Sequence, residues 1–126
     1  MGSSSDSRIM HGASEVLDKF NVKHEDQIIS AHRTPTMLNK YAKHAENSGF
    51  KVIIAGAGGA AHLPGMIASH TIIPVIGVPI LVYNDKQDKK SPKYKFSAFR
   101  GLDSFLSISE MPSVSPVVTV GVNKAG

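Results

Sequence analysis

The sequence contains no cysteine and no tryptophan among its 126 residues. Without cysteine there can be no disulfide, no thiolate metal site and no thiol nucleophile. The sequence also lacks an apolar run of the roughly 20 residues that a membrane-spanning helix needs. Its opening residues, Met-Gly-Ser-Ser-Ser-Asp, have neither the basic nor the apolar part of a secretory signal peptide. We therefore expect a cytoplasmic protein with no membrane partner.

The net positive charge of the chain lies in one stretch. Residues 83–100 hold six basic and two acidic residues, which accounts for the whole net charge of +4. Because the remainder is formally neutral, we expect no nucleic-acid partner. The stretch also holds Tyr83, Tyr94, Phe96 and Phe99, so RNA binding is an alternative to a solvated loop or a subunit contact. We interpret it as a basic insertion within a single domain spanning residues 1–126.

Hydrophobic periodicity predicts alternating helices and strands. Helices are predicted over about 7–20, from Thr34-Pro35 to about residue 48, and over about 61–70 and 102–110. Strands are predicted at 27–30, 51–55, 74–78 and 116–122. This alternation predicts an α/β protein with a parallel sheet. Ligands of such sheets bind at the carboxyl ends of the strands.

Three loops carry residues suited to chemistry. The first is Gly2-Ser3-Ser4-Ser5-Asp6, directly before a helix, where backbone N–H groups and hydroxyls suit a phosphate and Asp6 suits a sugar diol. Plain helix capping is the alternative for this loop. The second, residues 30–35, holds His32, which can give and take a proton, and Arg33, which can grip phosphate. A surface His-Arg pair is the alternative there.

The third loop, residues 56–66, is rich in glycine and follows an apolar strand. Its glycines allow positive φ and a close approach of a ligand to the backbone. It matches neither a dinucleotide-binding fingerprint nor a phosphate-binding P-loop. His62 in this loop is either a ligand contact or a structural histidine. The six histidines of the chain show no metal-binding spacing with a carboxylate nearby, so we expect no metal site.

Taken together, these loops resemble the bacterial-type 5-(carboxyamino)imidazole ribonucleotide mutase family. The matching segments are GSSSD at 2–6, SAHRTP at 30–35, AGAGGAAHLPGM at 55–66, PVIGVP at 74–79, GLDSFLSISEMP at 101–112 and NKAG at 123–126. SAHRTP and AGAGGAAHLPGM are highly specific when they occur in this order. The resemblance covers nearly the whole chain apart from residues 83–100.

The resemblance implies a flavodoxin-like three-layer αβα sandwich, a homo-octamer and no cofactor. It implies a ribonucleotide substrate whose carbamate carboxylate moves to a ring carbon. His32 matches the family's general acid/base. The residues that match its ribose-phosphate contacts are Ser3, Asp6, Ser30 and Arg33. Those that match positions at the base end of its site are Ala57, Gly58 and His62.

The chain departs from the family pattern in ways that leave alternatives open. The family's first strand and C-terminal helix are not found in the sequence, and residues 83–100 replace a short connection. A carboxylase that uses free carbon dioxide on aminoimidazole ribonucleotide is a close alternative to the mutase. A non-catalytic ribonucleotide-binding fragment or paralogue is an alternative from another class.

Overall fold

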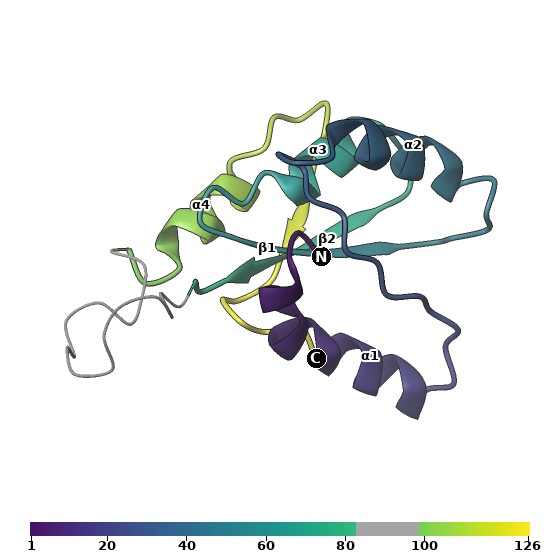
Figure 1. Ribbon diagram of the computed structural model, residues 1–126, viewed down its shortest axis with the longest axis horizontal. Coiled ribbons are helices and arrows are strands. Elements are labelled where there is room, and N and C mark those ends of the chain that lie inside the picture. Colours follow the sequence, from purple (N-terminus) through teal and green to yellow (C-terminus); the bar gives the residue numbers. More distant parts are fainter. Residues whose placement is uncertain (83–98) are drawn as a thin grey trace.

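The computed structural model describes residues 1–82 and 99–126 of the chain. The expected insertion at 83–100 lies almost entirely outside these residues. A parallel sheet of three strands, β1 (Ile53–Gly58), β2 (Val75–Ile80) and β3 (Val118–Thr119), runs through the centre of the described part. Helix α1 (Ser7–Lys19) covers one face of this sheet, and α2 (Pro35–Ala45), α3 (Leu63–Ala68) and α4 (Leu102–Ser109) cover the other (Figure 1). The three layers confirm the predicted flavodoxin-like α/β class.

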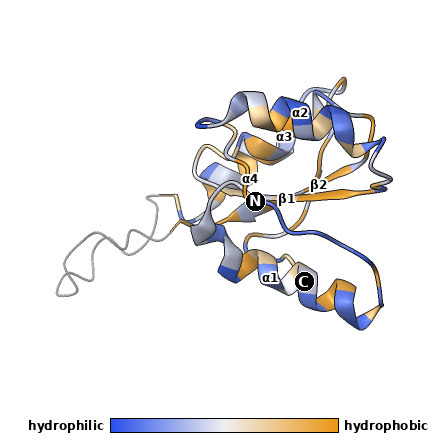
Figure 2. Cartoon of the chain, turned by 45° about the vertical axis from the view of Figure 1, so that its right-hand side comes forward, coloured by the Kyte–Doolittle hydropathy of each residue, from blue (hydrophilic) through white to orange (hydrophobic). Residues whose placement is uncertain are grey.

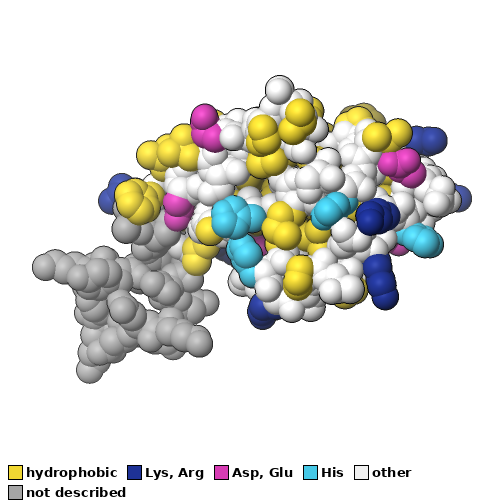
Figure 3. Space-filling view, turned by 90° about the horizontal axis from the view of Figure 1, so that it is seen from above, with side chains coloured by type: hydrophobic (Ala, Val, Ile, Leu, Met, Phe, Trp, Pro, Cys, Tyr) yellow, Lys and Arg dark blue, Asp and Glu magenta, His cyan; other side chains and the backbone are white. Residues whose placement is uncertain are grey.

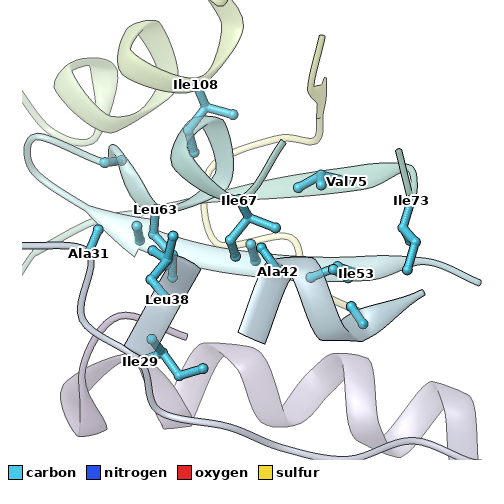
Figure 4. Close-up of a cluster of buried hydrophobic side chains, with 14 residues drawn as sticks. Ile29, Ala31, Leu38, Ala42, Ile53, Leu63, Ile67, Ile73, Val75 and Ile108 are labelled. Atoms are coloured by element: carbon cyan, nitrogen blue, oxygen red, sulfur yellow. The ribbon is translucent and has the colours of Figure 1, made fainter. Parts of the chain in front are cut away.

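The alternation of side chains along the strands divides the core between the two faces of the sheet. Ile53, Ala55 and Val75 join the larger cluster, which α2, α3 and α4 complete with Leu38, Ala42, Leu63, Ile67 and Ile108 (Figure 4). Ile54, Val78 and Ile80 pack on the opposite face with Met10 of α1. Apolar residues accordingly concentrate on the sheet and on the inward faces of the helices (Figure 2).

Several predicted elements are absent or differ in extent from those observed. The strand predicted at 27–30 is wrong, because the backbone of Gln27 and Ile29 bonds to the single residue Met1 and forms no ladder. The final strand is reduced to Val118–Thr119, opposite Ile76 and Gly77. The second helix ends at Ala45, and the third spans Leu63–Ala68 instead of 61–70. No helix within the described residues is long and apolar enough to cross a membrane.

The outer edge of β1 borders a cavity of about 490 Å³. Gly2 donates a backbone hydrogen bond to Gly56 at one end of this edge, and residues 22–27 form the opposite wall. The cavity is larger than the one formed by the predicted functional loops. Its lining is mainly apolar and contains neither His32 nor Arg33, so we assign the chemistry to the smaller cavity described below.

Candidate active site

The three loops singled out in the sequence meet at the carboxyl end of β1. They line a single cavity of about 260 Å³ together with Val82, which follows β2. All eight predicted site residues line it: Ser3, Asp6, Ser30, His32, Arg33, Ala57, Gly58 and His62. The three loops therefore share one hollow, although only the glycine-rich loop directly follows a strand of the sheet.

The loop before α1 forms a capping box. The Ser3 side chain accepts from the Ser5 backbone N–H, and the Asp6 carboxylate accepts from the Ser3 backbone N–H at 3.0 Å. These bonds order a single turn of 3-10 helix, Ser4–Asp6, which runs directly into α1. The capping interpretation is thus confirmed, and the same two side chains also border the cavity.

Asp6 is a buried acid, since only 7% of its surface is exposed. Burial raises the pKa of Asp6, because a carboxylate is poorly solvated there. Hydrogen bonds from Ser3 and Ser5 oppose this shift in the pKa but do not cancel it. The charged form of Asp6 is therefore unfavourable in the folded protein. The side chain lies at the wall of the cavity, where its carboxylate can accept hydrogen bonds from a ligand.

Asp6→Asn is expected to raise the free energy of unfolding at neutral pH. A carboxyl whose folded pKa is raised makes the folded state bind protons more readily, so stability falls as the pH rises above 3.8. The amide has the same shape and carries no charge, which removes this loss. Urea unfolding at acid and neutral pH measures the effect, and Asp18→Asn, whose side chain is 75% exposed, is the control. An unchanged pH dependence would contradict the prediction.

The second loop is a tight turn organised around Ser30. Thr34 donates to the Ser30 carbonyl oxygen through both its backbone N–H and its hydroxyl, each at 2.9 Å. The Ser30 hydroxyl in turn accepts from the backbone N–H and from Nε of Arg33, at 3.2 and 3.3 Å. Ser30 therefore orients the Arg33 guanidinium, and its own hydroxyl hydrogen stays available to a ligand. Within the described part of the chain, no carboxylate forms an ion pair with Arg33.

Two histidines from separate loops meet at the cavity. Nε2 of His32 lies 2.8 Å from Nδ1 of His62, and the rings meet edge to face at 82°. His32 belongs to the turn before α2, whereas His62 is the N-cap residue of α3 and makes no side-chain cap bond. Both residues are exposed at the rim of the cavity. Figure 3 shows several histidine side chains at the surface of the face seen from above.

The glycine-rich loop forms a wall that tolerates no side chain at Gly58. A Cβ there would lie 2.8 Å from the Ile80 carbonyl oxygen and 2.5 Å from Val82 Cγ2. The Ile80 oxygen belongs to the backbone of β2 and has little freedom to move. Gly59, the next residue, has a φ of 64°, which favours glycine. The expected positive φ and bare backbone are therefore both found in this loop.

Six further residues line the cavity: Gly2, Ser5, Ala31, Ala60, Leu63 and Val82. The first five lie within or beside the loops that the sequence analysis selected. Val82 was missed, although its place just after a strand neighbouring β1 could have indicated it. Within residues 1–82 and 99–126, no three histidine or acidic side chains are grouped so as to hold a metal ion.

Comparison with known proteins gives one consistent family. The family model described as AIR carboxylase matches residues 1–126. The N5-carboxyaminoimidazole ribonucleotide mutase of Thermotoga maritima is 51% identical over 99% of this chain and 65% of its own length. The protein of the same name from Pyrococcus horikoshii is 54% identical over 99% of this chain and 63% of its own.

A plant protein matches the same region of the chain. The chloroplastic phosphoribosylaminoimidazole carboxylase of Vigna aconitifolia is 50% identical over 99% of this chain and 20% of its own length. The chain thus spans slightly under two thirds of the two mutases and a fifth of the plant carboxylase. From the family match over its whole length and these identities, we conclude that the chain belongs to the AIR carboxylase family.

Proposed function

We propose that this chain carries the catalytic site of a 5-(carboxyamino)imidazole ribonucleotide mutase, an isomerase of de novo purine (IMP) biosynthesis. It moves the carboxylate of its substrate from the exocyclic amine to the ring carbon. The observation that supports this most directly is one cavity that combines the imidazole of His32, the guanidinium of Arg33 and the hydroxyl-rich turn before α1. Relatives named as this mutase, about half identical to the chain, support the same proposal.

The proposed site has two ends. His32 is the catalytic residue. The ribose-phosphate end consists of Ser3, Asp6, Ser30 and Arg33, whose side chains offer hydroxyls, a carboxylate and a cation. The base end consists of Ala57, Gly58 and His62. Gly58 contributes only backbone to this end, because the space that a Cβ would take is already filled by the Ile80 carbonyl oxygen and by Val82.

The proposed reaction needs one proton carrier. The carbamate N–C bond breaks and releases carbon dioxide, while protonated His32 gives its proton to the departing nitrogen. The electron-rich ring carbon then attacks carbon dioxide and forms the new C–C bond. Neutral His32 finally removes the proton from that ring carbon, which restores both the aromatic ring and the protonated histidine. Atoms and charge balance without an external reactant, in keeping with our proposal that the enzyme uses no cofactor.

Carbon dioxide must be kept in the site between the two bond changes. The cavity of about 260 Å³ is slightly below the roughly 300–1,000 Å³ of common small-molecule pockets, and both histidines at its rim are exposed. A second surface that excludes water would retain the gas. We propose that neighbouring subunits of a homo-octamer supply it, in the cytoplasm.

Exposed apolar side chains support self-association. Met37 of α2, Leu102 and Leu106 of α4, and Val114 are 45–86% exposed. The space-filling view from above shows several apolar side chains at the surface of the molecule (Figure 3). Burying such residues between copies of the chain would stabilise an oligomer. Sedimentation of the purified protein would measure the number of subunits.

The direct test is turnover of the carbamate-bearing nucleotide without ATP, followed by the formation of the ring carboxylate. Product formation that depends on protein concentration supports the mutase. Tight binding of the nucleotide without turnover would instead favour the non-catalytic alternative. The carboxylase alternative has a specific observation in its favour, the similarity to the plant carboxylase. If this chain were a direct carboxylase, it would form product from aminoimidazole ribonucleotide and bicarbonate, whereas a mutase would prefer the carbamate.

Arg33→Ala is expected to weaken nucleotide binding about 10- to 150-fold, because a hydrogen bond to a charged group contributes roughly 1.5–3 kcal/mol. Binding titrations should be run with the nucleotide and with the nucleoside that lacks its phosphate. The substitution should affect only the nucleotide. Arg33→Lys keeps the charge but cannot form bidentate hydrogen bonds, so its affinity for the nucleotide should lie between those of the wild type and Arg33→Ala. An equal loss of affinity for the nucleoside would show that Arg33 does not hold the phosphate.

A further inference from the structure

The contact between His32 and His62 limits which nitrogen of His32 can meet a substrate. Nε2 of His32 is 2.8 Å from Nδ1 of His62, which is a hydrogen-bond distance. A single hydrogen shared between these two nitrogens gives each of them a hydrogen-bond partner. Nδ1 is then the nitrogen of His32 that remains free to exchange a proton with a ligand.

The same bond couples the tautomers of the two rings. If His32 donates from Nε2, then His62 must leave Nδ1 bare and carry its proton on Nε2. If His62 donates from Nδ1, then His32 must carry its own proton on Nδ1. When both rings are neutral, they are therefore either both protonated on Nε2 or both protonated on Nδ1, because the shared hydrogen bond determines which nitrogen of each ring carries the proton.

Local structure indicates that His62 is present for this contact. Its side chain makes no capping bond to α3, although it stands at the N-cap position. It is also exposed, so burial does not fix its ring. The edge-to-face arrangement at 82° places the edge of one ring toward the other. Fixing the His32 ring in this way limits its rotation during two successive proton transfers.

We propose that His62 is a positioning residue that holds His32 through Nε2 and presents Nδ1 of His32 to the substrate. This inference rests on the proposed function, because it assigns how the proton carrier of that reaction is oriented. It replaces the direct contact with the base end of the substrate, proposed above for His62, with an action through His32. A direct substrate contact would act on binding, whereas a positioning residue acts on the proton-transfer step.

The first test is independent of turnover. Protein labelled with ¹⁵N in its histidines should show a scalar coupling between Nε2 of His32 and Nδ1 of His62 at low temperature and alkaline pH. Such a coupling passes only through a shared hydrogen. Its absence from the wild-type spectrum would overturn the proposal.

The second test is kinetic and uses His62→Phe, which keeps an aromatic ring and removes both nitrogens. We expect kcat to fall about tenfold, the size of one lost neutral hydrogen bond, with KM changed less than twofold. His70→Phe, which removes a histidine bonded to Asn39, is the matched control and should leave both constants unchanged. A rise in KM with normal kcat would overturn the positioning role in favour of direct substrate contact.

The two proposals can fail separately. Coupled histidines in a wild-type chain that shows no turnover would overturn the mutase function, and with it any catalytic use of the pair. An active wild-type chain without the coupling would overturn only the pairing. Finding the coupling together with the loss of kcat in His62→Phe supports both.

Discussion

His32→Asn should lower turnover by about 10²–10⁴, the range of general acid–base catalysis. Histidine is the one side chain whose ordinary pKa lets it both give and take a proton near neutral pH. The proposed reaction requires the same group to donate to the carbamate nitrogen and later to accept from the ring carbon. Asparagine can occupy this position and still form a hydrogen bond with His62, but its amide can neither give up nor take up a proton near neutral pH.

Nucleotide binding should be largely retained in His32→Asn, because Arg33, Ser3 and Asp6 are untouched. Turnover should be measured at saturating nucleotide, and affinity separately by titration. His44→Asn makes the same substitution at an exposed position in the last turn of α2 and is a suitable control. If the His32→Asn variant turned over normally, another group would have to be the proton carrier. If it lost affinity as well as rate, His32 would be a binding residue.

Much of the fold followed from local sequence signals. Helix α1 and the starts of α2 and α4 lie within a few residues of their predicted positions, and periodicity together with Pro35 defines the first two. The buried strands β1 and β2 were recognised from short β-branched runs. The segment at 27–30 has a similar apolar character, and it still forms no ladder in the structure. Whether an apolar segment becomes a strand depends on its neighbours in space, which local patterns do not contain.

The members of the candidate site were predicted better than their interactions. The parallel topology places the glycine-rich loop at the carboxyl end of β1, where ligands of such sheets bind. The other two loops follow no strand in the described residues, and the sequence indicated them through the residue types in their motifs. The sequence carries no signal for the 2.8 Å contact between His32 and His62, because these residues are 30 positions apart. It also does not reveal that the Ser30 hydroxyl binds Arg33. Such pairings depend on backbone geometry at a precision that motifs do not carry.

Ile108→Ala should lower the free energy of unfolding by about 2–5 kcal/mol, a large part of the roughly 5–15 kcal/mol of a typical domain. Ile108 is fully buried in the larger core cluster. Its Cγ2 lies 2.4 Å from where a Cβ of Gly77 would be, so α4 and β2 are in close contact. Alanine would leave a cavity that the backbone of β2 cannot fill.

The same substitution should also disturb the active site, because α4 supports the end of β2. Ser104 of α4 is fully buried and donates to the Ile80 carbonyl oxygen at 3.1 Å. That oxygen lies against Gly58, and Val82 just beyond it lines the cavity. Urea unfolding at fixed protein concentration, which an oligomer requires, measures the stability, and nucleotide titration measures the site. Glu110→Ala, at the exposed C-cap of the same helix, should change the stability far less. Equal losses from Glu110→Ala and Ile108→Ala would mean that burial against β2 does not determine the stability of α4.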